Sequence, residues 1–266
     1  MFILYDNPIS TNAQKVRLVL AEKALDFESR ILDLQAGDQF QPDYLMLNPN
    51  AQVPTLVDGE RVFRESTVIS EYLEDICPEP SLLPRNPALR AEMRWFTEQT
   101  ISWMSPMINS LNVALVFRHI YARKPKQQLD EFWEANPNPI QLSRQRSCHD
   151  EGVKSPYVQI SLQRYRSFII ELNARLEMTG PWLLGEAFTL ADTALFPYLY
   201  RLNQMGFERI SSKARAYNLW FDAMTSRKSV KVEIVKKIPK NILLAHQNLV
   251  KQDQRALDLI LVGLGV

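Results

Sequence analysis

The sequence predicts a protein with two differently built parts, an α/β region followed by an all-helical region. Up to about residue 77, short apolar runs of strand length alternate with segments of helical spacing. Residues 77–87 then contain four prolines, which neither continue a helix nor pair within a sheet. Beyond them strand signals fade, and apolar residues recur every three or four positions. The proline-rich stretch therefore predicts the junction between two domains.

The first part is expected to have the element order βαβαββα. Its predicted strands cover residues 2–5, 27–34, 53–57 and 61–64. The last two flank Asp58-Gly59, which is a strong hairpin signal. The predicted helices are one that ends near Lys23, a short one over 42–47 and one that carries apolar residues up to 76. Ser66 is placed to cap the last of these helices.

The second part is expected to be helical. Helical spacing of apolar residues covers roughly 88–119, 157–176, 190–205, 214–224 and 230–238. A polar segment with several prolines, about 124–155, separates the first two of these helices as a long insert. The predicted organisation is therefore a first domain over 1–77, a linker over 78–88 and a helical domain over 89–266.

Composition and charge narrow the class of protein. The 266 residues are 46% hydrophobic and 23% charged, as in soluble globular proteins, and the net charge is +1. This balance hides a split, because the chain has a net charge of −8 through Pro80 and +9 afterwards. The basic residues of the second part are scattered among helical positions, so a solvated face is favoured over a nucleic-acid interface.

Cysteine and histidine usage predicts neither disulfides nor a metal site. Cys77 and Cys148 lie far apart without a partner pattern, and the three histidines are dispersed. Cys148 precedes His149, but adjacent residues seldom face each other productively, so a catalytic pair is disfavoured. The apolar start is too short for a signal peptide, and no run is long enough to cross a membrane. These features predict a protein of the reducing cytoplasm.

The loop before the first helix is the first candidate for chemistry. Ser10, Thr11 and Asn12 place two hydroxyls and an amide at a helix N-terminus, where the helix dipole stabilises an anion. A thiolate brought there would accept hydrogen bonds from these groups, and its pKa would fall. Simple helix capping explains the same residues equally well.

Two further pairs could bind a small peptide. Pro54 enters a strand without a backbone donor, which indicates either a cis bond or a strand edge. A cis bond would leave the N–H and C=O of Val53 free to pair with an extended peptide ligand. Glu65 and Ser66 open a helix, so they could hold the ammonium and carboxylate of an α-amino acid end. Helix capping by Ser66 is the simpler explanation.

Three motifs in order give a specific resemblance. Residues 11–17, 47–56 and 65–69 closely resemble the N-terminal domain of the glutathione S-transferases, and residues 185–192 look like the structural capping motif of that family. In that motif Thr189 and Asp192 would form a reciprocal capping box. The resemblance spans about residues 1–225. A narrower similarity, over residues 65–75, 90–94, 136–140 and 142–146, is to the bacterial glutathione-dependent β-aryl etherases, which cleave lignin-derived aryl ethers.

The resemblance implies a fold and a set of partners. Residues 1–77 would be a thioredoxin-like glutathione-binding domain, and residues 89–266 an all-helical domain for the substrate and for dimerisation. Glutathione would be the cosubstrate, without a metal. The other ligand would be a hydrophobic, aromatic electrophile, and the protein would form a homodimer with no nucleic-acid or membrane partner.

The resemblance also assigns site residues. The glutathione contacts would be Gln39, Gln52, Val53, Pro54 in a cis bond, Glu65 and Ser66. Phe40 stands beside Gln39 where many relatives carry a basic residue, so the resemblance does not assign a partner to the glycyl carboxylate. Asn12 and Ser10 rank ahead of Thr11 as the group that activates the thiolate. Ile9 and Met107 are expected to contact an aromatic substrate.

The favoured function is an enzyme that directs a glutathione thiolate at an electrophilic carbon, with β-aryl ether cleavage as the specific case. General detoxifying conjugation, dehalogenation and isomerisation use the same thiolate and stay as alternatives. A binding module that keeps the fold without catalysis is the alternative from another class, because fold alone does not determine chemistry. The intact pairs Val53-Pro54 and Glu65-Ser66 favour the enzyme.

Overall fold

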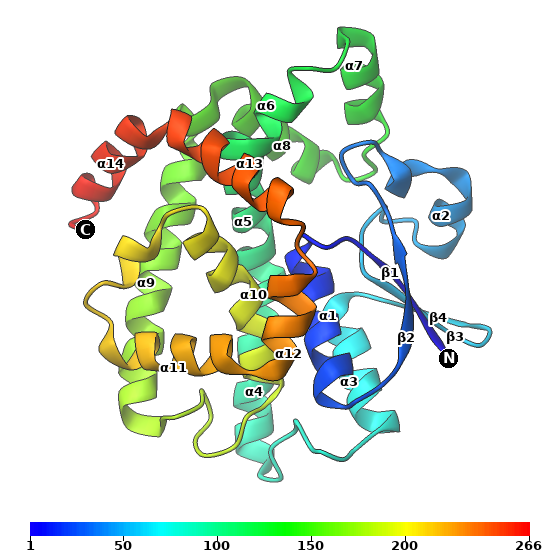
Figure 1. The fold of residues 1–266 in the computed structure, drawn as a ribbon, viewed down its shortest axis with the longest axis vertical. Coiled ribbons are helices and arrows are strands. Elements are labelled where there is room, and N and C mark those ends of the chain that lie inside the picture. The colour runs from blue at the N-terminus through cyan, green and yellow to red at the C-terminus, as the bar shows by residue number, and fades with distance from the viewer.

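The computed structural model describes all residues, 1–266, and its N-terminal region contains one four-stranded sheet (Figure 1). The strands are β1 (Phe2–Asp6), β2 (Phe27–Ile31), β3 (Thr55–Asp58) and β4 (Arg61–Arg64), in the spatial order β2-β1-β3-β4. β1 runs parallel to β2 and antiparallel to β3, and β3 pairs antiparallel with β4. The helices of this region are α1 (Thr11–Glu22), α2 (Pro42–Leu47) and α3 (Ser66–Ile76), with a 3₁₀ turn, η1 (Asp38–Phe40), before α2. The predicted order βαβαββα is confirmed.

The element boundaries differ from the predicted ones at functionally relevant places. β3 begins at Thr55, because Pro54 has no N–H to donate to the ladder. β2 ends at Ile31, without the predicted extension to residue 34. α1 begins at Thr11 with Ser10 as its N-cap, so Asn12 lies in the first helical turn instead of just before it.

A long, composite helix opens the helical region. It consists of α4 (Pro87–Gln99), the π-helical η2 (Thr100–Met104), α5 (Ser105–Asn112), the π-helical η3 (Val113–Phe117) and α6 (Arg118–Tyr121). Pro106 lies just after the end of η2 and cannot donate a helical hydrogen bond, which favours a widened turn there. The predicted helix over 88–119 is confirmed, and the structure adds these two π-helical turns.

The remaining helices follow the predicted segments and add four more. The insert forms α7 (Lys126–Glu134) and α8 (Pro139–Glu151), with the 3₁₀ turn η4 (Gly152–Lys154). The core helices are α9 (Pro156–Thr179), α10 (Leu190–Gln204), η5 (Glu208–Ser211), α11 (Arg215–Ser226), α12 (Lys228–Val230) and the π-helical η6 (Lys231–Lys236). The chain ends with α13 (Lys240–Gln252) and α14 (Gln254–Gly263), which the periodicity did not predict.

The capping box of α10 is confirmed. Asp192 accepts from the Thr189 backbone N–H at 2.9 Å, and the Thr189 side chain accepts from the first turn of the helix. Trp220 Nε1 and the Leu183 N–H also donate to Asp192, at 2.9 and 3.1 Å. Burial raises the pKa of the Asp192 carboxyl, and these donors act in the opposite direction. The box therefore joins α10 to α11 and to the loop before it.

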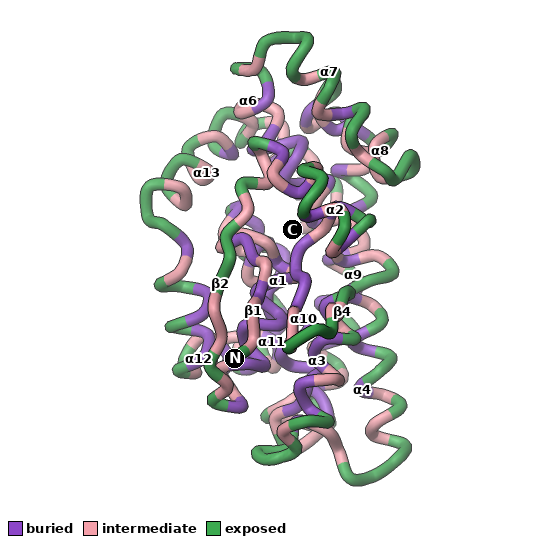
Figure 2. Tube along the Cα trace, turned by 90° about the vertical axis from the view of Figure 1, so that its right-hand side faces the viewer, coloured by how far each residue is buried: buried purple, intermediate pink, exposed green.

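One hydrophobic core runs through both regions. A single cluster of buried side chains extends from Leu4 and Val16 to Leu257 and Leu261. Figure 2 shows mostly buried residues along α1 and α10, which pack against each other, and mostly exposed residues on α7. None of the helices combines the length and the apolar character needed to cross a bilayer. The loop before α1 is therefore held between two packed regions.

Candidate active site

A cavity of about 690 Å³ lies where the N-terminal loops meet α5 and the insert. Nine of the predicted site residues line it together: Ile9, Ser10, Thr11, Asn12, Gln39, Gln52, Val53, Glu65 and Ser66. Pro54 and Met107 are not among the lining residues, and Met107 packs partly buried against the hydrophobic core. The lining contains only two charged side chains, Glu65 and Arg144.

Two buried arginines fix the backbone of the first loop. Arg17 Nη2 donates to the Pro8 carbonyl at 3.1 Å, and its guanidinium forms a fully buried ion pair with Asp6. Arg201, from α10, donates to the Ile9 carbonyl at 2.9 Å. Burial lowers the pKa of Arg201 to about 10, which still leaves it charged at pH 7. The carbonyls before α1 are therefore held from both regions, and the side chains after them start from a fixed backbone.

The three thiolate candidates lie in different surroundings at the start of α1. Ser10 Oγ accepts from the Ala13 N–H at 3.3 Å, so its hydroxyl proton stays free to donate elsewhere. Thr11 is buried, and its hydroxyl makes no hydrogen bond within the protein. Asn12 Oδ1 accepts from the Tyr198 hydroxyl at 2.5 Å. The amide nitrogen of Asn12 has no partner within the protein and is not fully enclosed, and Asn12 lines the cavity.

Tyr198 is a hydrogen-bond partner of Asn12 that the sequence did not reveal. It lies on α10, far from Asn12 in the sequence, and is almost completely buried. Burial raises the pKa of its phenol well above the ordinary value, so the hydroxyl remains a donor at every physiological pH. Because that donor occupies the oxygen of the Asn12 amide, the amide nitrogen is left available to another partner. The sequence shows only an apolar helix position at Tyr198.

The backbone of Val53 is free to bind a peptide. The Val53–Pro54 bond is cis, as the family resemblance implies. Neither the N–H nor the C=O of Val53 makes a hydrogen bond within the protein. The preceding carbonyl, of Gln52, is held by the Tyr44 hydroxyl at 2.5 Å and by Asn48 Nδ2 at 2.9 Å. An extended ligand can therefore pair with Val53 without displacing an existing hydrogen bond.

Glu65 and Ser66 lie at the same end of the cavity, and one prediction about them is wrong. Ser66 does not cap α3: it is the first helical residue, and Glu65 occupies the N-cap position without a capping hydrogen bond. Glu65 has a φ of 64°, an unfavourable conformation for a non-glycine residue that is found preferentially at functional sites. Its carboxylate accepts a 3.4 Å contact from Asn50 Nδ2. The free helix N–H groups and the Ser66 hydroxyl next to this carboxylate suit a zwitterionic ligand.

A buried lysine lies behind this end of the cavity. Lys15 Nζ donates to Thr67 Oγ1 at 2.6 Å and to Thr100 Oγ1 at 3.1 Å. Burial lowers its pKa to about 7, against the smaller opposing effects of Glu65 and Glu98. The lysine thus links α1, α3 and η2 through hydroxyl groups instead of a carboxylate.

The opposite wall of the cavity comes from residues that the sequence analysis did not single out. It contains Ile101, Ser105, Pro106, Asn109, Phe117, Tyr121, Phe132, Asn136, Ile140, Gln141, Arg144 and Gln145. Gln52 Nε2 donates to Gln141 Oε1 at 3.2 Å, which joins this wall to the N-terminal region. Gln39, on the first wall, donates to the Leu34 carbonyl at 3.2 Å. Aromatic rings and amides together make the second wall suitable for an aromatic ligand with polar substituents.

The cysteines and histidines do not form a second site. Burial raises the pKa of the Cys148 thiol, and His149 contacts Asp150 instead of Cys148. Cys77 donates to the Glu79 carbonyl at 3.4 Å, outside the cavity. No group of three or more histidine, cysteine, aspartate or glutamate side chains is arranged to hold a metal ion.

Comparison with known proteins identifies the family. Residues 4–81 match the family model for the glutathione S-transferase N-terminal domain, and residues 141–223 match the family model for the C-terminal domain. Protein LigF from Sphingobium sp. (strain NBRC 103272 / SYK-6) is 30% identical over 255 residues, which cover 92% of this chain and 97% of LigF. The chain therefore belongs to the glutathione S-transferase family.

Further relatives agree with this assignment. Glutathione S-transferase TCHQD from Arabidopsis thaliana is 26% identical, covering 82% of this chain and 84% of that protein. The crystal structure of the β-etherase LigF superposes with a TM-score of 0.79 at 26% identity, covering 88% of this chain and 99% of LigF. A glutathione S-transferase from Rhodospirillum rubrum F11 shares the fold, with a TM-score of 0.67. The protein is an enzyme of the glutathione transferase type, resembles the β-etherases, and has glutathione as its cosubstrate.

Proposed function

We propose that this enzyme binds glutathione in the 690 Å³ cavity as a thiolate and directs the sulfur at the β-carbon of a lignin-derived aryl ether. The observation that carries the proposal is the amide of Asn12, a lining residue of the cavity, whose oxygen is occupied by Tyr198 while its nitrogen has no partner in the protein. A donor at the N-terminus of α1 favours an anion through both its hydrogen bond and the helix dipole. The similarity to LigF over most of the chain favours an ether as the substrate.

Glutathione would lie along the first wall. Glu65 accepts the ammonium of the γ-glutamyl end, and Ser66 with the α3 N-terminus takes its carboxylate. The N–H and C=O of Val53 pair with the cysteinyl backbone, next to the cis bond of Pro54, and Gln39 and Gln52 supply further polar contacts. Ile9 and Met107 are proposed for the aromatic substrate, and of these Ile9 lines the cavity. This placement brings the sulfur to Ser10 and Asn12.

The reaction is a displacement. The thiol first loses its proton, the sulfur then forms a bond to the β-carbon, and the carbon–oxygen bond breaks. Its electron pair leaves with the phenoxide oxygen, which takes up a proton to give the phenol. Orientation of the two reactants can supply several kcal/mol toward the barrier, and each hydrogen bond to the thiolate about 1–3 kcal/mol.

A single-turnover assay tests the proposal. The enzyme with glutathione and a β-aryl ether dimer should release the phenol, and omission of glutathione should abolish the release. Substrates for general conjugation, dehalogenation and isomerisation run in parallel identify the reaction if the ether is left intact. Absence of turnover with every substrate, combined with tight glutathione binding, would favour the binding module.

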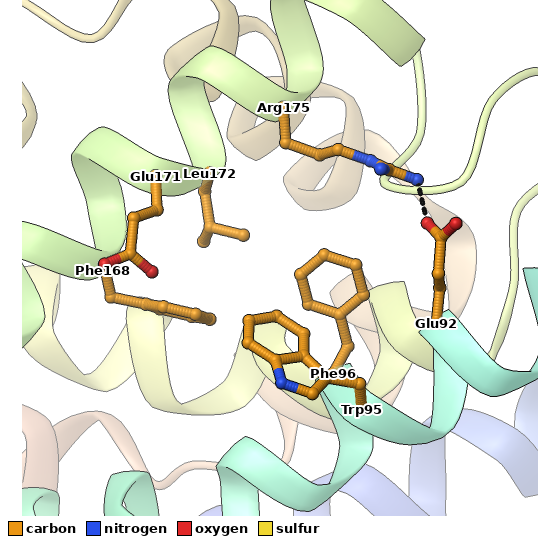
Figure 3. A pocket seen from close by; sticks show the side chains of 7 residues that line it. All are labelled: Glu92, Trp95, Phe96, Phe168, Glu171, Leu172 and Arg175. Carbon is orange, nitrogen blue, oxygen red and sulfur yellow. Dashed lines mark hydrogen bonds and ion pairs between the residues drawn. The ribbon is translucent and has the colours of Figure 1, made fainter.

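We also propose a homodimer, whose contact includes a second, smaller cavity. This cavity of about 290 Å³ lies between α4 and α9 and is lined by Trp95, Phe96, Phe168 and Leu172, with Glu92, Glu171 and Arg175 around them (Figure 3). Trp95 is half exposed, an unusual state for a tryptophan beside an apolar cavity. The acidic first part and basic second part suit packing of one subunit's α/β region on the helical region of the other.

Light scattering at several salt concentrations measures the oligomeric state. Trp95→Asp should lower the mass toward that of a monomer, whereas Leu259→Asp, at an exposed apolar position on α14, should not. A monomer at every salt concentration would contradict the homodimer.

The two free cysteines are consistent with the proposed cytoplasmic location.

A further inference from the structure

Arg144 is an unpaired cation on the wall of the active-site cavity. It lies on α8, in the insert, and forms no ion pair and no hydrogen bond with any protein group. Its Nε is completely enclosed and has no partner. A half-buried guanidinium with five donors and no acceptor loses hydration without compensation, which is unfavourable for the free protein. A ligand that accepts hydrogen bonds from the guanidinium would compensate for this lost hydration.

The groups around Arg144 do not supply a counter-charge. Cys148 and Tyr157 are the groups that act on its charge, and a thiol and a phenol are both neutral at pH 7. Burial lowers the pKa of Arg144 from its ordinary value, yet a guanidinium keeps its proton throughout the physiological range. The only other charged residue of the lining, Glu65, lies with Ser66 at the start of α3 and makes no ion pair with Arg144. The cation is therefore available to a bound anion.

The neighbouring amides hold α8 in place. Gln145 Nε2 donates to Asn109 Oδ1 at 3.0 Å, and Asn136 Nδ2 donates to Gln145 Oε1 at 3.2 Å. One turn earlier, Gln141 accepts from Gln52. These contacts join α8 to α5 and to the first wall of the cavity without involving Arg144. Arg144 is thus carried on a helix that these contacts hold against the cavity.

We propose that Arg144 binds a second carboxylate, on the insert side of this cavity. The inference rests on the proposed function and names the chemistry of the ligand group on the insert side. Arginine presents a planar pair of donors that matches both oxygens of a carboxylate. Two sources can supply that group: the glycyl end of glutathione, or a carboxylate on the aromatic acceptor. In either case Arg144, in the insert, would recognise a negatively charged ligand group on a wall that is otherwise uncharged.

Calorimetric titration with two matched ligand pairs tests this inference and separates the two sources. The first pair is glutathione and its glycyl ethyl ester, and the second is S-benzylglutathione and S-(4-carboxybenzyl)glutathione. Each is titrated into the wild type, Arg144→Met and Arg146→Met. Arg146 lies on the same helix and does not line the cavity, so its variant controls for loss of a positive charge. Arg144→Lys keeps the positive charge but removes the planar pair of guanidinium donors, so it tests whether carboxylate binding needs that pair.

The wild type should prefer the carboxylate member of one pair by about tenfold in Kd, and Arg144→Met should lose that preference. A lost preference in the first pair assigns the glycyl end, and in the second pair the acceptor. Arg146→Met should behave as the wild type. Preferences that are unchanged in Arg144→Met would overturn the inference while leaving the proposed function intact. Failure of the wild type to bind any of the four ligands would overturn the proposed function, and this inference with it.

Discussion

The two walls of the active-site cavity are built in different ways. The first wall uses short runs of sequence: residues 9–12 and 65–66 lie where a strand leads into a helix, and residues 52–53 lie just before β3. The second wall uses residues scattered over 101–145, which approach the first wall through contacts such as the one between Gln52 and Gln141. The first wall therefore depends on local backbone geometry, and the second on the packing of distant helices. Their charges also differ, with Glu65 on one wall and Arg144 on the other.

The difference between the walls predicts that each can be damaged without the other. Changes on the first wall should affect glutathione binding and the thiolate, whatever the acceptor. Changes at the insert should affect the acceptor side, with glutathione binding altered only where Arg144 holds its glycyl end.

The largest effect is expected from Glu65→Gln. It removes the charge proposed to pair with the ammonium of glutathione but keeps the side-chain size, so the dissociation constant should rise about ten- to a hundredfold. Calorimetric titration measures it, and Glu60→Gln, at the exposed turn between β3 and β4, is the matched control. Ser66→Ala should weaken binding less. Unchanged affinity in both Glu65→Gln and Ser66→Ala, with folding intact, would remove this ligand site.

The second effect concerns the pH dependence of stability through Lys15. Its pKa is about 7 in the folded protein against an ordinary value of 10.5 for the unfolded chain, so between these values the unfolded chain binds more protons. The contribution of Lys15 to the free energy of unfolding should therefore rise as the pH increases from 7 toward 10. Below pH 7 this contribution should stay constant. Lys15→Met removes this slope, so its stability relative to the wild type should be greatest at pH 6 and fall by roughly 2 kcal/mol by pH 9.

Denaturant unfolding at pH 6 and pH 9 measures this difference. Lys23→Met provides the contrast, because Lys23 is a buried lysine with a carboxylate partner, Glu74, at 2.5 Å. Its loss should destabilise the protein at both pH values by leaving Glu74 unpaired. Equal pH slopes in the wild type and Lys15→Met would show that Lys15 does not titrate as its burial implies.

Tyr198→Phe should have a smaller effect, confined to the thiolate. Without the phenol the Asn12 amide can rotate, so the pKa of bound glutathione should rise by about one unit, and the rate at neutral pH should fall about tenfold or less. Glutathione affinity should change little. Tyr217→Phe is the control, because Tyr217 is equally buried and its hydroxyl has no partner. A thiolate titration identical in both variants would leave Tyr198 with a packing role only.

The smallest effect is expected from Gln141→Ala, which cuts the amide contact between the walls. A single neutral hydrogen bond contributes about 0.5–1.5 kcal/mol, so KM for the acceptor should rise a few-fold. Glutathione binding should remain as in the wild type. Gln127→Ala, on the exposed surface of α7, is the control. An equal loss of glutathione affinity would show that the two walls are not separable.

The same contrast explains what the sequence could predict. The order βαβαββα, the capping box at Thr189 and Asp192 and the gathering of residues 9–12 with Glu65 follow from turns, caps and short motifs. The insert helices could not be predicted, because α8 buries little apart from Cys148 and so lacks an apolar stripe. Tyr198 and Arg144 are brought to the cavity by tertiary packing alone. The division into domains at residues 78–88 and the individual roles of the site residues stay predictions.

Donors at the start of α1 are proposed to lower the pKa of the glutathione thiol. The direct measurement is the ultraviolet absorbance of bound glutathione thiolate against pH in the wild type, Asn12→Ala and Ser10→Ala, with Thr11→Ala as the lower-ranked candidate. We expect the thiol of bound glutathione to titrate below free glutathione in the wild type, and about one unit higher in Asn12→Ala and in Ser10→Ala than in the wild type. Titrations that coincide in the wild type and both variants would contradict it.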